Sequence, residues 1–354
     1  MPLHDRLRAD PPGFGSPNIP ECGVRPYSIV DKGPAYWILL ALITRVITLL
    51  HPTLLKRERA MKRLKPFEYL EPNTLEEAIG ILVGEGPRAL PLAGGTDLLV
   101  RMKQGVVSPS LLVNLKRIAG LDRIERSAAG GTTIGALTSI AAVERYEPLR
   151  QSHPVLIQAA GLLGSPSIRS LATLGGNVGR ASPAADMVPA LIALKAGIVA
   201  QGPSGKREIP IDAFFKGPGS TVLGPAEIIT AILLPDPAPA SGAAYLKLGR
   251  REGMDCALVG VAAALSCGGD ERVVDARLAI ASCGPVPLRA ESAEAVLLAG
   301  PLDESRLREA ARATAGNSCP ITDMRACSDY RKEMVEVLAY RALRAAWQTA
   351  RRAL

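Results

Sequence analysis

The chain has 354 residues, 47% of them hydrophobic, so it can bury a large core and is long enough for two domains. Its formal net charge is +8, yet aromatic residues make up only 4%, and the basic residues do not form one run interleaved with aromatics. This pattern argues against a nucleic-acid surface and favours a solvated or subunit-facing one.

Residues 1–60 differ in composition from the rest of the chain. A tract rich in Pro and Gly precedes the apolar run Ala35–Leu50, which Arg45 interrupts. As a helix this run would span about 24 Å, less than the roughly 30 Å of a bilayer's hydrocarbon core. We expect residues 1–60 to be an extension outside the fold, as an upstream start codon would add, with no stable membrane span. A membrane-surface helix over 35–50 is the alternative.

A helix and two strands are predicted between residues 61 and 120. Thr74–Gly84 starts with a capping box and places its apolar residues on one helical face. Ala89–Ala93 and Leu111–Leu115 are short apolar runs typical of strands. Together they predict a small lobe of strands and a helix.

The first of these strands runs directly into a glycine turn, Gly94, Gly95 and Thr96. Glycine has no Cβ, so backbone N–H groups in such a turn can approach an anion, and positive φ costs little. A strand end, a glycine turn and a helix start lying together suit a pyrophosphate.

Shorter elements are predicted from residue 121 onward. The strands are Leu121–Arg126 and Thr132–Ile134, and the helices are at about Ile140–Arg145 and Pro154–Leu163. Between them, Gly135–Thr138 indicates either a close approach of the backbone to something or a bulge. Further on, Gly197–Gln201, Ile209–Phe215 and Glu227–Leu234 complete this region.

A second glycine segment, Thr173–Asn177, lies in the stretch Gly164–Leu194. Ser182 and Pro183 are placed as N-cap and first residue of a helix with Asp186 in its opening turn, so the segment should deliver a ligand to a helix N-terminus. Such a turn also occurs without a ligand, and Asp186 would then only complement the helix dipole. Two matching glycine segments favour two ends of one pyrophosphate.

The stretch Pro235–Gly242, rich in Pro, Ala, Ser and Gly, predicts a boundary between domains. Beyond it the pattern predicts an antiparallel sheet followed by helices. The strands are Ala243–Gly249, Leu258–Cys267 and Asp275–Cys283, and the helices are Ser292–Leu298, Ser305–Ala315 and Asp329–Thr349.

Cysteines and histidines are too scattered to form a metal site. No two of the six cysteines have CxxC spacing, and none lies between Cys22 and Cys256. The histidines are His4, His51 and His153, too dispersed for a zinc site or a general base. Reduced thiols in a cytoplasmic protein are the expectation.

The segments LAGGTDLL, TIGALTS and ATLGGNVGRASPAADMVPALIAL, in this order and spacing, resemble the FAD-binding medium subunits of molybdenum-containing hydroxylases, the group of xanthine dehydrogenase and carbon monoxide dehydrogenase. The resemblance runs from about Lys65 to about Trp347. It implies an α+β fold: a two-lobed FAD-binding domain of the vanillyl-alcohol-oxidase (PCMH) type over 61–235, with lobes at about 61–120 and 121–235. A smaller α+β domain of the carbon monoxide dehydrogenase flavoprotein C-terminal type would follow over 240–354.

The function that this resemblance implies is electron transfer. Substrate is oxidised at a molybdenum cofactor on a large subunit, electrons pass through [2Fe–2S] clusters on a small subunit, and FAD on this chain passes them to an external acceptor. The chain lacks a cysteine framework for such clusters, so they belong to partners. A cytoplasmic dimer of heterotrimers is expected, and the substrate pocket would lie on another polypeptide.

The resemblance also implies a set of cofactor-binding residues and no catalytic residue. The two glycine segments should hold the pyrophosphate, Asp186 should accept from sugar or ribityl hydroxyls, Leu163 and Leu223 should lie against the ring system, and Lys247 should contact the flavin. The full set is Ala93, Gly94, Gly95, Thr96, Asp97, Leu98, Gly135, Thr138, Leu163, Thr173, Gly175, Gly176, Asn177, Asp186, Leu223 and Lys247.

Two other functions stay open on the residues. One is a self-contained flavin oxidoreductase, which the lack of a histidine near either glycine segment disfavours. The other is a non-catalytic partner protein that has kept the fold, which two intact glycine segments disfavour. On the residues alone, Leu163 and Leu223 would also serve as core, and Lys247 as a solvated strand residue.

Overall fold

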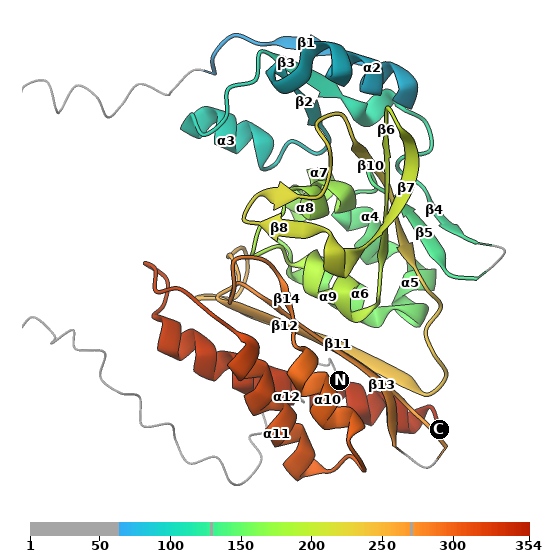
Figure 1. The fold of residues 1–354 in the computed structure, drawn as a ribbon, viewed down its shortest axis with the longest axis vertical. Coiled ribbons are helices and arrows are strands. Elements are labelled where there is room, and N and C mark those ends of the chain that lie inside the picture. Colours follow the sequence, from blue (N-terminus) through green and yellow to red (C-terminus); the bar gives the residue numbers. More distant parts are fainter. Residues whose placement is uncertain (1–63, 128–129, 270–271) are drawn as a thin grey trace, which may run out of the picture. The chain divides into compact units, whose positions relative to one another are not determined.

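The computed structural model describes residues 64–127, 130–269 and 272–354, all within one compact unit, Lys62–Leu354 (Figure 1). The predicted extension 1–60 and its apolar run 35–50 lie outside the described residues. Among the residues that are described, no helix has both the length and the apolar character needed to cross a bilayer.

The first lobe is a three-stranded parallel sheet with two helices. The strand order is β1 (Glu68–Leu70), β3 (Leu111–Asn114), β2 (Ala89–Leu92), with α2 (Leu75–Glu85) and α3 (Leu98–Gln104) beside them. The capping box starts α2 as predicted, because Thr74 Oγ1 accepts from Glu77 N at 3.1 Å and Glu77 Oε2 accepts from Asn73 N at 2.9 Å. The predicted helix and both predicted strands are confirmed.

The second lobe is built on a five-stranded antiparallel sheet. Its order is β4 (Ile124–Arg126), β5 (Thr132–Gly135), β10 (Ile228–Leu234), β6 (Gly197–Gly202), β7 (Gly205–Pro210). The predicted strand Leu121–Arg126 is shorter than expected. Its first residues form a turn, in which Leu121 O accepts from Leu137 N at 2.6 Å.

Six helices of this lobe come from the stretch between β5 and β6. They are α4 (Ile140–Arg145), α5 (Glu147–Ser152), α6 (Pro154–Leu162), α7 (Pro166–Leu171), α8 (Leu174–Gly179) and α9 (Met187–Ala193). A short hairpin, β8 (Phe215–Gly217) and β9 (Ser220–Thr221), follows β7. The predictions for α4 and α6 are confirmed to within a residue.

The predicted helix start at Ser182 and Pro183 is wrong. Ser182 Oγ accepts from Ala184 N at 3.3 Å and so begins a local turn, whereas α9 starts at Met187 with Asp186 as its N-cap. Two other helices of the stretch Gly164–Leu194 have hydroxyl caps: α7 starts after Ser165, and α8, which contains the glycine pair itself, starts after Thr173. The second glycine segment is therefore a helix N-terminus rather than an open turn.

The C-terminal part pairs an antiparallel sheet with three helices, as predicted, and the sheet has a fourth, short strand that the sequence did not predict. The strands are β11 (Ser241–Leu248), β12 (Val259–Cys267), β13 (Val273–Ala281) and β14 (Leu288–Arg289), and the helices are α10 (Glu291–Leu298), α11 (Glu304–Asn317) and α12 (Ser328–Arg352). Gly242, the second residue of β11, lies where α12 crosses the strand so closely that a Cβ would collide with Ala346 O.

Each face of this sheet packs against a different set of helices (Figure 1). Helices α10 to α12 cover one face and share its apolar core. Helices α6 and α9 contact the other face, where Tyr245, Ala262 and Ala279 join the core of the second lobe. The C-terminal sheet is thus in direct contact with the helices that lead to and from the second glycine segment.

Candidate cofactor-binding site

A cleft of about 450 Å³ lies between the two lobes and is lined by both glycine segments. From the first lobe come Ala93, Gly94, Gly95, Thr96, Asp97 and Leu98, and from the second Thr173, Gly175, Gly176 and Asn177. Leu163 and Leu223 also line it. The structure therefore brings together in one cleft residues that lie up to 130 positions apart in the sequence, from 93 to 223.

The first glycine segment is a turn with open backbone donors. Gly95 has φ +75°, and Gly94 passes so close to α7 that a Cβ would collide with Leu171 O. In the part of the chain that the structure describes, no hydrogen bond uses the N–H groups of residues 94–97. Residues 94–97 line a cleft, and unpartnered backbone amides in such a place can hold phosphate oxygens.

The second glycine segment already uses its backbone donors. Thr173 Oγ1 accepts from Gly176 N at 3.1 Å, and Ala136 O accepts from Gly175 N at 2.8 Å. A Cβ on Gly175 would lie 2.6 Å from Ala136 Cβ, so this glycine lets α8 pack against the turn after β5. Its role in the structure is close packing that brings Ala136 and Leu137 to the cleft.

One polar atom of the second segment remains without a partner. Asn177 Oδ1 is buried and accepts no hydrogen bond from any described residue, yet Asn177 lines the cleft. A buried acceptor without a partner costs free energy unless a ligand supplies the donor. Open amides on one wall and an open amide oxygen on the other fit a ligand with phosphates and hydroxyls.

Two predicted site residues, Asp186 and Lys247, pair with each other instead of lining this cleft. Lys247 Nζ lies 2.9 and 3.0 Å from the two oxygens of Asp186, and Tyr245 Oη donates to Asp186 at 3.1 Å. Lys247 also donates to Leu162 O at 2.9 Å. Burial raises the pKa of Asp186 and outweighs the opposing effect of Lys247.

Comparison with known proteins matches two family models to successive parts of the chain. Residues 65–237 match the family model described as the FAD binding domain in molybdopterin dehydrogenase, and residues 243–346 match the CO dehydrogenase flavoprotein C-terminal domain. The carbon monoxide dehydrogenase medium chain of Hydrogenophaga pseudoflava is 35% identical over 285 residues, which are 79% of this chain and 97% of that one. This chain belongs to the FAD-binding medium subunits of molybdenum hydroxylases.

Other members of the family support this assignment. The glyceraldehyde dehydrogenase medium chain of Sulfolobus acidocaldarius is 32% identical over 278 residues, 78% of this chain and 97% of that one. The solved carbon monoxide dehydrogenase of Hydrogenophaga pseudoflava, in a form lacking the Mo-pyranopterin moiety, matches with a TM-score of 0.78 and 34% identity. The match covers 81% of this chain and 99% of the solved chain. Membership makes this chain a flavoprotein component of an oxidoreductase, with FAD as its cofactor.

Gly135 and Thr138 of this medium subunit also lie outside the cleft lining. A Cβ on Gly135 would collide with Leu121 O, so the close approach predicted from the sequence is to the chain's own backbone. Thr138 is fully buried, and its carbonyl accepts from Leu174 N at 3.0 Å, which fixes the start of α8. Both residues hold neighbouring segments of the cleft wall in place without lining the cleft themselves.

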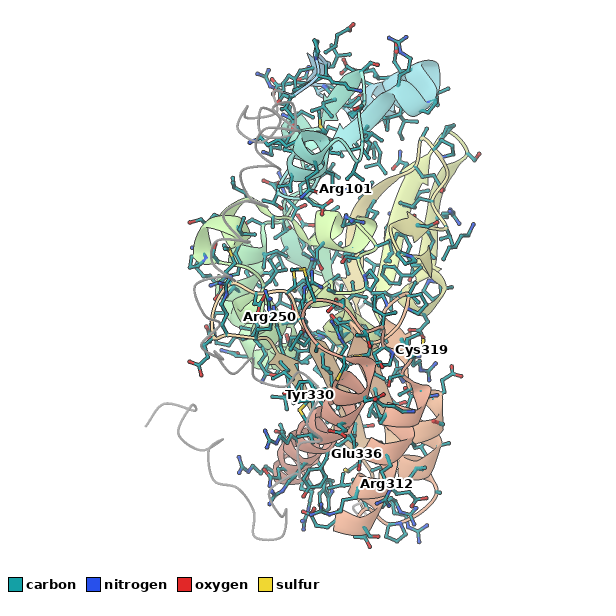
Figure 2. The ribbon with its side chains drawn as sticks, turned by 90° about the vertical axis from the view of Figure 1, so that its left-hand side faces the viewer. Arg101, Arg250, Arg312, Cys319, Tyr330 and Glu336 are labelled. Carbon is teal, nitrogen blue, oxygen red and sulfur yellow. The ribbon has the colours of Figure 1, made fainter. Side chains whose placement is uncertain are left out.

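Sequence reasoning missed three charged residues of the cleft, Arg101, Arg180 and Glu227. Glu227 is engaged by Arg207 at 2.7 Å and by Gly224 N at 2.6 Å, and the bonds to Arg207 lower its pKa. Arg101 comes from α3, on the border between the lobes (Figure 2). Their positions in the sequence could have indicated both arginines. Arg180 comes shortly after the second glycine segment, and Arg101 lies one helical turn beyond Asp97.

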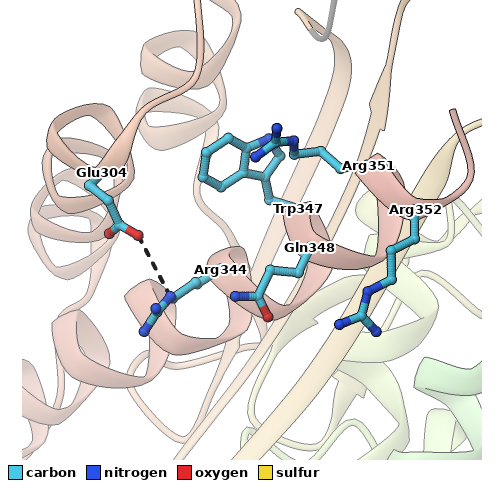
Figure 3. A pocket seen from close by; sticks show the side chains of 6 residues that line it. All are labelled: Glu304, Arg344, Trp347, Gln348, Arg351 and Arg352. Carbon is cyan, nitrogen blue, oxygen red and sulfur yellow. Dashed lines mark ion pairs between the residues drawn. The ribbon is translucent and has the colours of Figure 1, made fainter. Parts of the chain in front are cut away.

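A second hollow, of about 600 Å³, lies on the C-terminal helices (Figure 3). Glu304 of α11 pairs with Arg344 at 3.6 Å, and Arg351 lies over the ring of Trp347, 5.2 Å from its centroid. It is lined only by side chains of two helices and contains no backbone turn. The cleft between the lobes is therefore the candidate FAD site.

Proposed function

We propose that this chain is the FAD-binding electron-transfer subunit of a molybdenum-containing hydroxylase or dehydrogenase complex, taking electrons from [2Fe–2S] clusters of a partner subunit to an external acceptor. The observation that carries the proposal is the cleft between the lobes. Its first glycine turn offers unpartnered amides at residues 94–97, and Asn177 offers an unpartnered oxygen on the opposite wall.

The residues of this chain bind and orient the cofactor, and FAD supplies the redox chemistry when bound. We assign the pyrophosphate to the open amides of the turn over residues 93–98, with Thr173, Gly175, Gly176 and Asn177 as the opposite wall and the ring system against Leu163 and Leu223. Asp186, Lys247, Gly135 and Thr138 stay in the proposed set. The contacts of all four support a role in holding the walls of the site.

We divide the chain into an FAD-binding domain over 61–235, with lobes at about 61–120 and 121–235, and a C-terminal domain over 240–354. The ends of the two matched family models, 237 and 243, support this division. So does the passage from β10 to β11 through residues 235–240. We place residues 1–60 outside both domains.

The proposed partners are a large subunit with the molybdenum cofactor and a small subunit with [2Fe–2S] clusters, arranged as a dimer of heterotrimers in the cytoplasm. Support comes from the relatives, which are named medium chains of different dehydrogenases, one for carbon monoxide and one for glyceraldehyde. Similar medium chains serving different substrates are consistent with a substrate pocket on another subunit.

A self-contained oxidoreductase is the alternative in which this chain would need its own acid–base residue. His153, the histidine within the described ranges, is almost fully buried, 1% exposed, and bonds Pro235 O at 2.9 Å and Ser152 Oγ at 2.8 Å. Burial lowers its pKa. These contacts favour a structural role for His153 and disfavour the alternative.

Purification of the tagged full chain from its own host tests the proposal. We expect a flavin spectrum, FAD on extraction, and co-purification of a molybdenum-containing and an iron–sulfur-containing polypeptide. A flavin-loaded chain that oxidises a substrate without partners would support the self-contained alternative. A purified chain without flavin, and without flavin uptake on adding FAD, would contradict the proposal.

A further inference from the structure

Two arginines from different lobes converge on one carboxylate at the mouth of the cleft. Arg180 Nε lies 2.7 Å from Asp97 Oδ2, and Arg101 Nη1 lies 3.9 Å from the same oxygen. All three residues line the cleft. Asp97 belongs to the first glycine segment and Arg180 follows the second, so this contact joins the two segments directly.

The guanidinium groups of these arginines retain unused donors. In the described ranges, the side chain of neither Arg101 nor Arg180 donates a hydrogen bond, and Arg180 Nε is buried without one despite its short ion pair. A guanidinium carries five N–H donors in a planar fork that matches phosphate oxygens. The pairing with Asp97 therefore neutralises charge but leaves most of the hydrogen-bonding capacity free.

The charges around the cleft leave a positive excess at this point. Glu227, the other carboxylate of the lining, is held by Arg207. Asp97 is thus shared by two arginines, and its side chain is 47% exposed, so it can turn away at little cost. An exposed pair of this kind contributes little to stability.

We propose that Arg180, assisted by Arg101, binds the cofactor's pyrophosphate, and that Asp97 is an internal counter-ion which the pyrophosphate displaces. This inference rests on the proposed FAD site and adds a charged wall to its open amides. Asp97 takes a role opposite to that of a binding residue, because its carboxylate competes with the phosphates for the same donors. The chain pre-orients both arginines before the cofactor arrives.

The proposal predicts effects of opposite sign for the two partners of one ion pair. Arg180→Met should weaken FAD binding by about ten- to a hundredfold, because charge-assisted bonds to the pyrophosphate are lost. Asp97→Asn should tighten FAD by roughly two- to fivefold, because the competing charge is removed. Asn is also a good N-cap, and Asp97 makes no capping bond at the start of α3.

The experiment is titration of the apo full chain with FAD and with riboflavin, which has no phosphate, followed by flavin fluorescence. Arg180→Met should leave riboflavin affinity unchanged and should reduce the salt dependence of FAD binding. Arg126→Met is the matched control, since it breaks an exposed pair with Asp236 at 3.0 Å that is outside the cleft lining. It should change neither affinity.

Two results would overturn the inference while leaving the FAD site intact. If Arg180→Met binds FAD as tightly as the unchanged chain, the arginine does not contact the pyrophosphate. If both variants lower the affinity for FAD alike, the ion pair only holds the two lobes together. Failure of the unchanged chain to bind FAD would contradict the proposed function and this inference together.

Discussion

An aspartate follows each glycine segment, Asp97 directly after Thr96 and Asp186 nine residues after Asn177. Asp97 is the N-cap of α3 and Asp186 the N-cap of α9, and neither side chain makes a capping hydrogen bond. Instead each forms an ion pair: Asp97 with Arg180, its side chain 47% exposed, and Asp186 with Lys247, its side chain 9% exposed. Both belong to the set of cofactor-binding residues that the resemblance implies.

Burial separates the roles of these two carboxylates. Breaking an exposed ion pair costs little free energy, so one of its partners can pair with a ligand instead. Breaking a buried ion pair costs much more, because one charge would remain buried without compensation. The first segment thus combines open amides with an exposed ion pair, and we propose that a ligand exchanges with this counter-ion. The second is fixed, with used amides and a buried lysine from the C-terminal domain behind it.

The largest expected effect comes from breaking the buried pair. Lys247→Met should lower the free energy of unfolding by about 3–5 kcal/mol near neutral pH, because Asp186 stays buried and unpaired. The pKa of Asp186 is already raised by burial and should rise further. The folded state then binds a proton more readily than the unfolded state, so the loss should shrink as pH falls. Thermal melts across pH measure this.

Two variants serve as controls for that melt. Asp275→Asn removes another contact between the domains, the exposed pair with Lys195 at 2.6 Å, and should cost less than about 1 kcal/mol. The double variant Lys247→Met with Asp186→Asn should recover much of the stability, since no unpaired charge remains. If Lys247→Met lowers the free energy of unfolding no more than Asp275→Asn does, the contrast between the buried and the exposed ion pair is wrong.

Elements with a complete local signal were predictable from the sequence, and long-range contacts were not. The capping box at Thr74 defines α2, and the glycine turn at Gly94 and Gly95 indicated one wall of the cleft. Ser182 and Thr173 are both hydroxyl residues before a helical run, but of the two it is Thr173 that caps a helix, and Thr173 also forms an isolated antiparallel bridge with Ser139. No local pattern contains that information.

The partners of the two aspartates illustrate the same limit. Lys247 is 61 residues from Asp186, and its burial depends on how β11 packs on α6 and α9. The resemblance pointed to both residues as part of the site, but not to their pairing. Arg180 was overlooked because its importance depends on the first lobe, which supplies Asp97 from 83 residues earlier.

The next largest effect concerns the open turn. Gly95→Ala should cost about 1–2 kcal/mol, because Gly95 has φ +75° and an L-residue is strained there. Its amide lies among the unpartnered donors, so FAD affinity should fall together with stability. Gly105→Ala is the matched control, with φ +73°, no atom within 4 Å of a new Cβ, and a place outside the cleft lining.

Melts of the apo forms and FAD titrations distinguish the two glycines. We expect both variants to lose similar stability but only Gly95→Ala to lose affinity. Equal FAD affinity in both would mean that the first turn does not contact the cofactor.

A smaller effect is expected at the cap of α8. Thr173→Ala should cost about 1 kcal/mol, because Gly176 N loses its acceptor, Thr173 Oγ1. Thr173→Ser keeps a hydroxyl at this position and should restore most of that loss. Thermal melts of the apo proteins provide the comparison, and equal melting of the Ala and Ser variants would show that the hydroxyl bond does not stabilise α8.

The smallest effect is expected at Gly176, one of the two glycines of the second glycine segment. In the structure it lies inside α8, so Gly176→Ala gains about 1 kcal/mol of helix propensity. The new Cβ would lie 2.7 Å from Thr173 Oγ1, which must move, and the weakened cap offsets the gain. Stability and FAD affinity should both change little.

Gly80→Ala is the control, because Gly80 lies inside α2 and a new Cβ there has no atom within 4 Å. Its change in stability measures the gain in helix propensity alone. A large selective loss of FAD affinity in Gly176→Ala would mean that the amides of α8 leave their protein acceptors for the pyrophosphate, and that the two glycine segments are equivalent after all.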